Sequence, residues 1–218
     1  VMAWTNQTIS DADITPAKTG ISAKPRWNTE FNLGAHLGPH QDNNISGVPD
    51  LGLQYSDSAG ASELVKAYTL AAGRAYSRQY FYKNSQVSDR SLGIQMYYIT
   101  GLAHDYQPTK TVEEAYNNIV LRYTGATVSS KFCAASGFNG QSNIGGCIFT
   151  SAKYPNGFAV LWSNDGLRTK TPLDIALGTK NLSIYSMPHN WAGITTTDGM
   201  VEFAGEPVMV VPTPPKTV

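Results

Sequence analysis

Four Asn-Gly or Asp-Gly pairs lie within 61 residues of the sequence, and they constrain the fold more than any other feature. Asn, Asp and Gly tolerate a positive φ, so these pairs are typical of the tight primed turns that join antiparallel strands. The four pairs are Asn139-Gly140, Asn156-Gly157, Asp165-Gly166 and Asp198-Gly199. Their spacing predicts antiparallel β structure through most of the second half of the chain.

The segments between these turns have the patterns of strands. Residues 158–162 are a continuous apolar run, residues 182–187 alternate, and residues 208–211 are a Val-rich run between two prolines. A further alternating segment covers residues 92–99. We therefore expect a mainly β fold, an antiparallel β-sandwich or jelly roll, decorated by two short helices.

The two helices are predicted from periodicity and from their end signals. Residues 59–72 place apolar side chains on one helical face, and Gly73 is a natural stop. The second helix begins at Thr111, which forms a capping box with Glu114, and its pattern ends by Gly125.

The rest of the chain suggests three regions. Residues 1–58 are rich in Asn, Asp, Gly, Pro and Thr and predict an extended arm with loops. Residues 59–211 hold the β-sandwich domain, and residues 212–218 form a Pro-rich tail. Because the first residue is Val, we expect a product cut from a longer precursor, and we expect the arm and tail to lie on neighbouring subunits.

Charge excludes some classes of partner. The chain has 16 basic and 16 acidic side chains, and residues 1–30 carry three of each, so no basic arm is present. Bulk charge therefore gives no reason to expect strong binding to nucleic acid. No apolar run approaches the roughly 18 residues that span a bilayer, so no membrane span is expected.

Two cysteines flank a stretch with an Asn-Gly pair near its middle. A hairpin turning at Asn139-Gly140 would bring Cys133 and Cys147 opposite each other, where they either form a disulfide or remain buried thiols. A nucleophilic Cys147, with Gln141 before it and His189 or His40 as the base, is a competing hypothesis.

His36 and His40 have the spacing of metal ligands on a helix. The glycines and the proline around them make a helix improbable, so we expect loop histidines, no metal site and no cofactor.

Arg122, Ser151 and Glu206 resemble, in their order along the chain, the Arg, Ser and Glu of ADP-ribosyltransferases. The resemblance implies an Arg at a strand end, a Ser-centred strand and a late Glu that activates a ribose. The full Ser-Thr-Ser motif is missing, and Ala204 stands where an acidic or amide residue is expected.

These features together predict a structural subunit of a viral capsid or a similar shell, located in the virion. Its partners would be copies of itself or sister subunits, bound through exchange of arms. The alternative is a secreted β-rich enzyme or carbohydrate-binding module, with the ADP-ribosyltransferase-like site as one version of it.

Overall fold

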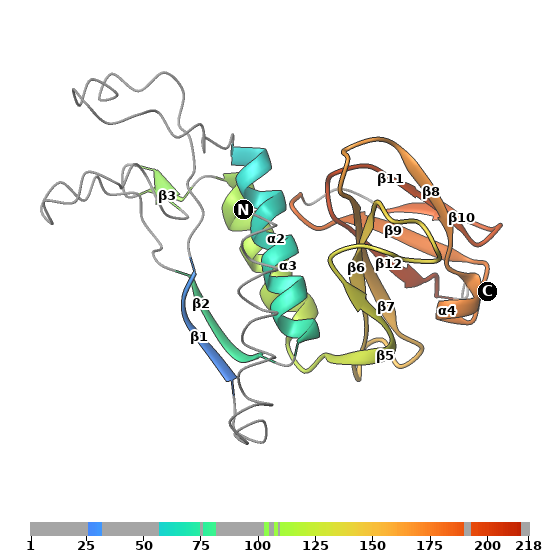
Figure 1. The fold of residues 1–218 in the computed structure, drawn as a ribbon, viewed down its shortest axis with the longest axis horizontal. Helices are drawn as coiled ribbons and strands as arrows, with labels where there is room; N and C mark the ends of the chain where they lie inside the picture. The colour runs from blue at the N-terminus through green and yellow to red at the C-terminus, as the bar shows by residue number, and fades with distance from the viewer. Residues whose placement is uncertain are drawn as a thin grey trace, which may run out of the picture.

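The structure of the chain is a computed structural model (Figure 1). It describes residues 26–31, 57–74, 76–81, 103–104, 107–108, 110–189 and 193–214. Most of the predicted arm, the end of the predicted tail and the strand predicted at residues 92–99 lie outside these ranges. His36 and His40 lie outside them as well.

A six-stranded sheet dominates the described part of the chain. Its strand order is β10-β9-β12-β7-β6-β5, and all five neighbouring pairs are antiparallel. In that order the strands are Ile194–Thr196, Leu182–Ser186, Val208–Pro212, Phe158–Ser163, Ile144–Thr150 and Thr127–Ala134. The predicted fold class, mainly β with antiparallel sheets and a few helices, is confirmed.

Three smaller sheets accompany it. Strands β8 (Thr169–Pro172) and β11 (Met200–Phe203) form an antiparallel pair, and so do the two-residue strands β3 (Ala103–His104) and β4 (Gln107–Pro108). Strands β1 (Arg26–Phe31) and β2 (Tyr76–Phe81) pair in parallel, which the sequence analysis did not predict. Strand β1 lies inside the predicted arm.

Helices α2 (Asp57–Gly73) and α3 (Lys110–Tyr123) correspond to the two predicted helices. A third helix, α4 (Asp174–Leu177), is a single turn, too short to produce a periodic pattern. In Figure 1 helices α2 and α3 lie between the β1–β2 pair and the six-stranded sheet.

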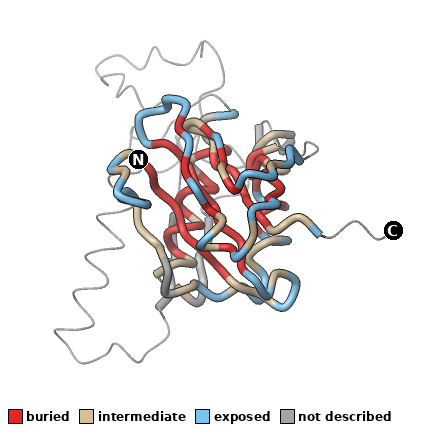
Figure 2. The backbone as a smooth tube through the Cα atoms, turned by 90° about the vertical axis from the view of Figure 1, so that its right-hand side faces the viewer, coloured by how far each residue is buried: buried red, intermediate tan, exposed pale blue. Residues whose placement is uncertain are grey.

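The six-stranded sheet is buried on both faces. In β7, Phe158, Val160 and Trp162 belong to a core shared with α2 and α3. The alternate residues Ala159 and Leu161 belong to a second core shared with β11, α4 and Leu173, which gives a sandwich-like layer. Since successive side chains of a strand point to opposite faces, a strand covered on both sides needs a continuous apolar run. The buried stretches of this region are red in Figure 2.

Helix α2 is buried on almost all sides rather than along one face. Nine of its residues between positions 61 and 71 are buried, and the helix contacts α3, β2, β5 and β6. Six of these nine are apolar, as expected for a helix with neighbours on several sides, and the other three are Ser62, Lys66 and Thr69. Its charged residues Glu63 and Lys66 pair with each other, with 2.7 Å between Lys66 Nζ and Glu63 Oε1.

The four Asn-Gly and Asp-Gly pairs do form turns, but only one has the predicted primed geometry. Asn139 has a φ of 49° and Gly140 a φ of 76°. In the other three pairs only the glycine has a positive φ. Two of the aspartates instead accept a hydrogen bond from the backbone N–H two residues later, at Leu167 and Met200. This Asx turn is an alternative to the primed turn.

The tip of the β5–β6 hairpin covers the free edge of β8. The side-chain amides of Asn139, Gln141 and Asn143 all donate to this strand, to Thr169, Lys170, Thr171 and Pro172. An uncovered strand edge invites pairing with another chain, so these amides protect the edge.

Within the described residues, none of the helices has the length and apolar character needed to cross a bilayer.

Candidate functional site

The structure brings two of the three predicted site residues near one tyrosine. Arg122 lies in the last turn of α3, not at the end of a strand, and its Nη1 donates to Tyr154 Oη at 2.9 Å. Ser151 follows β6, and its Oγ accepts from the Tyr154 backbone N–H at 3.2 Å. Arg122 and Ser151 therefore both fix the turn that leads from β6 to β7.

Glu206 lies at the other end of the six-stranded sheet. It precedes β12, whose Val208 is opposite Leu161 near the end of β7, whereas Tyr154 precedes the start of β7. The length of β7, about 3.3 Å per residue, separates the two ends. The ADP-ribosyltransferase-like arrangement needs all three side chains around one ligand, and the structure does not bring them together.

Glu206 instead belongs to a small polar cluster with Ser186 and His189. Ser186 Oγ donates to Glu206 Oε1 at 2.6 Å and accepts from the His189 backbone N–H at 3.0 Å. His189 Nε2 lies 3.5 Å from Glu206 Oε2, and both side chains are about one-third exposed. Glu206 was predicted as a site residue and Ser186 was not, because their contact depends on the pairing of β9 with β12.

The order of contacts in this cluster differs from that of a hydrolase triad. In a triad the imidazole lies between the nucleophilic hydroxyl and the carboxylate, so that it can remove the hydroxyl proton. Here the carboxylate of Glu206 accepts directly from Ser186. The arrangement ties the end of β9 to the turn before β12, which is also held by the hydrogen bond from Met187 N to Pro207 O.

The two cysteines are joined across β5 and β6. Cys133 and Cys147 are register partners with a Cα–Cα distance of 4.0 Å, and a disulfide connects them. The nucleophilic reading of Cys147 is therefore wrong for this structure, because its sulfur is bonded to Cys133.

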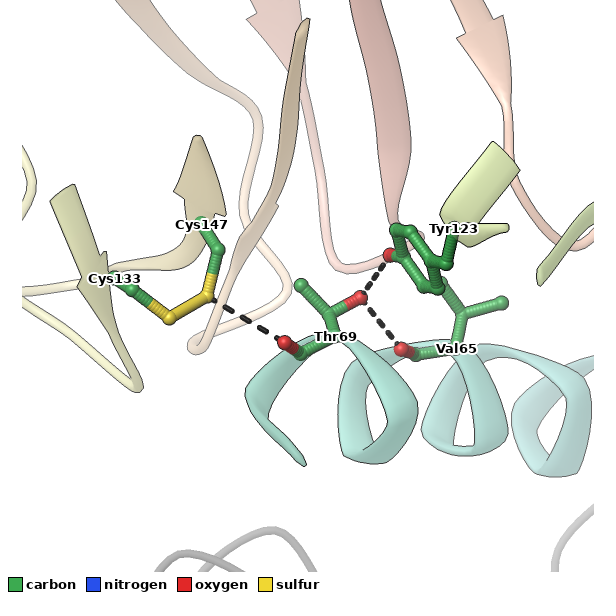
Figure 3. The surroundings of a disulfide bond; sticks show 5 residues. All are labelled: Val65, Thr69, Tyr123, Cys133 and Cys147. Carbon is green, nitrogen blue, oxygen red and sulfur yellow. Dashed lines mark hydrogen bonds between the residues drawn. A yellow bond between two sulfur atoms is a disulfide. The ribbon is translucent and has the colours of Figure 1, made fainter. Parts of the chain in front are cut away.

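The disulfide packs against α2 (Figure 3). Cys147 Sγ lies 3.6 Å from the backbone oxygen of Thr69. The Thr69 hydroxyl donates to the Val65 carbonyl at 2.7 Å and pairs with the hydroxyl of Tyr123 on α3. Since the Thr69 proton is used toward Val65, we assign the Tyr123 hydroxyl as the donor to Thr69.

Burial raises the pKa of Tyr123 far above the usual value for tyrosine, although its hydrogen bond with Thr69 acts in the opposite direction. Burial also raises the pKa of Tyr68, and the nearby Tyr116 adds to that effect. Both phenols therefore remain protonated at neutral pH, and Tyr123 acts as a structural donor between the two helices.

Over the described part of the chain, His, Cys, Asp and Glu side chains form no group of three able to hold a metal ion.

Comparison with known proteins adds a structural likeness. No protein-family model matches the chain, and no curated protein matches it. A solved structure of a family 39 glycoside hydrolase from the gut symbiont Bacteroides cellulosilyticus WH2 is similar, with a TM-score of 0.49 and 16% identity. The match covers 72% of this chain and 31% of that chain.

Proposed function

We propose that this chain contains the antiparallel β module of an enzyme, held in a fixed position on an α/β unit through helices α2 and α3. The observation that carries the proposal is the core shared by the two helices and one face of the six-stranded sheet.

Strand β1, helix α2 and strand β2 form a βαβ arrangement. These elements follow one another in the chain, and the two strands pair in parallel. Parallel strands joined through a helix belong to α/β proteins. In that class the catalytic groups gather at the carboxyl ends of the parallel strands, so an α/β unit favours an enzyme over a shell subunit.

The contact between this α/β unit and the six-stranded sheet is apolar and buried. Phe149, Phe158 and Trp162 face the helices with exposed fractions of 0 to 1%, and Ala61 and Ala115 are fully buried against the same core. Domains joined through small or polar interfaces move relative to each other. An apolar interface that is part of a common core fixes the module instead, which supports a stabilising role.

A side-chain hydrogen bond also joins helix α3 to the end of strand β9. Asn118 on α3 is buried, and its Nδ2 donates to the backbone oxygen of Met187, just after β9, at 3.0 Å. Its neighbour Asn117 is exposed on the same helix. The pair offers a matched test, because one asparagine contacts the module and the other does not.

The experiment uses the native polypeptide that contains this chain. The alternative predicted from the sequence is a secreted β-rich enzyme or a carbohydrate-binding module, so the assay measures both binding and hydrolysis of a panel of aryl glycosides. We expect binding or turnover of at least one glycoside. A native protein that neither binds nor hydrolyses any glycoside of the panel would contradict the carbohydrate assignment.

The fixed-module role is tested separately by thermal inactivation. Asn118→Ala removes a buried hydrogen bond worth about 1 kcal/mol and should lower the inactivation temperature by roughly 2–4 °C with an unchanged KM. Asn117→Ala should have no effect. Equal inactivation temperatures for the two variants would contradict the role of the interface.

The capsid function stays a prediction, and so does location in a virion. Size-exclusion chromatography of the native protein at low and high salt tests both. A particle of many subunits would favour the capsid function and contradict the enzyme module.

A further inference from the structure

The sequence holds two Asn-Gly pairs, Asn139-Gly140 and Asn156-Gly157, and the structure places each of them in a turn. Such a pair is chemically reactive, because glycine has no Cβ to hinder attack by its backbone nitrogen on Cγ of the preceding asparagine. The attacking nitrogen loses its proton to base in the solvent, the bond from Cγ to Nδ2 breaks, and ammonia leaves a cyclic imide. Water then opens the imide to aspartate or isoaspartate, so the net change is loss of ammonia and gain of water.

At Asn156 the attacking atom is held in place. Gly157 N donates to the backbone oxygen of Tyr154 at 3.0 Å, which closes the turn. Gly157 is buried, and a Cβ at its position would lie 3.2 Å from Phe149 O and 3.5 Å from Leu177 Cδ2. Attack on Asn156 therefore requires this hydrogen bond to break and a packed backbone segment to move.

At Asn139 the attacking atom is accessible, and the side chain is held instead. Gly140 is exposed, its N–H has no hydrogen-bond partner among the described residues, and a Cβ there would meet no atom within 4 Å. Asn139 Nδ2 donates to Pro172 O at 2.8 Å and to Thr171 Oγ1 at 3.3 Å. Rotation of this one exposed side chain breaks both bonds without moving the backbone, so reaction is easier here than at Asn156.

We propose that Asn139 is a site of spontaneous deamidation, and that this modification releases the tip of the β5–β6 hairpin from the edge of β8. An ionised aspartate or isoaspartate at this position donates no hydrogen bond, so it would face the Pro172 carbonyl oxygen as a second acceptor. Gln141 and Asn143 would then be the remaining amides that hold the tip on β8. The modification should therefore destabilise this end of the hairpin and uncover part of a strand edge.

Peptide mapping by mass spectrometry tests the site, and the folded chain carries its own control. At mildly alkaline pH the folded chain should convert Asn139 at least about fivefold faster than Asn156, the factor expected when a backbone hydrogen bond must first break. In urea, with the disulfide intact, the two residues should react at similar rates, because both precede glycine. Equal rates in the folded chain, faster reaction at Asn156 or an unreactive Asn139 would overturn the proposal.

A matched pair of variants tests the consequence of the modification. Asn139→Asp, which carries one product of the reaction, should lower the melting temperature by roughly 2–4 °C, the shift expected for one lost hydrogen bond. Asn156→Asp should leave the melting temperature unchanged, because Asn156 is exposed and its side chain has no hydrogen-bond partner in the described part of the chain. Equal melting temperatures for the two variants would contradict release of the hairpin tip.

Discussion

Gly73 and Cys133 are in direct contact where the end of helix α2 meets the β5–β6 hairpin. A Cβ atom at Gly73 would overlap Cys133 Sγ and would lie 2.6 Å from Cys147 Sγ. The disulfide thus approaches the helix backbone at a position where no side chain fits. Gly73, which the sequence analysis interpreted only as a helix stop, also makes room for the sulfur atoms.

Gly73→Ala should lower the free energy of unfolding by about 2 kcal/mol, because the new methyl group overpacks a filled site. Urea denaturation measures the loss. The same substitution in a Cys133→Ala/Cys147→Ala background should cost at least about 1 kcal/mol less, since the sulfur atoms are gone. Equal costs in the two backgrounds would mean that the contact with the disulfide is not the cause.

Loss of the disulfide should itself lower the stability by about 3 kcal/mol, the value expected from loop closure for a separation of 14 residues. Urea denaturation of Cys133→Ala/Cys147→Ala measures this loss. A reducing agent should destabilise the wild-type chain by a similar amount and leave the variant unchanged. A wild-type chain that does not respond to reduction would contradict the bonded state.

The partly buried tyrosines Tyr68 and Tyr123 should make stability fall at high pH. The pKa of Tyr123 is higher in the folded than in the unfolded chain, where it is about 10, so the unfolded chain loses the proton first. The stabilisation is therefore complete below pH 10 and is lost as the pH rises above that value. Urea denaturation at pH 8 and pH 10.5 measures the loss.

Tyr123→Phe should reduce this loss of stability, and Tyr68→Phe/Tyr123→Phe should reduce it further. At pH 8 the single variant should cost about 1 kcal/mol for the missing hydrogen bond to Thr69. A pH dependence identical to that of the wild type would contradict the raised pKa values.

The separation of Arg122 from Glu206 predicts additive effects on stability. Changes in unfolding free energy for Arg122→Met and Glu206→Ala should add within about 0.5 kcal/mol, since the two residues lie at opposite ends of the sheet. Ser186→Ala and Glu206→Ala should be clearly non-additive, because Ser186 donates to Glu206. Strongly non-additive changes for Arg122→Met and Glu206→Ala would contradict this separation and would favour the ADP-ribosyltransferase-like arrangement.

Much of the fold can be predicted from local pattern. The apolar run at residues 158–162 became β7, the alternating run became β9, and both helices begin and end within two residues of their predicted limits. These features follow from periodicity and end signals, which depend on neighbouring residues in the chain.

Other features depend on contacts that are distant in sequence. The parallel pairing of β1 with β2 joins segments 50 residues apart at Arg26 and Tyr76. The cluster of Ser186 and Glu206 forms only through the register of β9 with β12, and Gly73 meets the cysteines only through tertiary packing. The predicted site failed for the same reason. The order of Arg122, Ser151 and Glu206 along the chain does not determine the strand register, which places Glu206 at the other end of the sheet.

Native-state hydrogen exchange of helix α2 and strand β7 in the 218-residue chain tests most directly whether the helices and the sheet share one core. We expect the slowest amides of α2, around Val65, and those of β7, around Val160, to report the same free energy of opening with the same denaturant dependence. An opening free energy several kcal/mol lower for α2 than for β7 would show that the helix detaches from the sheet by itself, and would contradict a module fixed on its α/β unit.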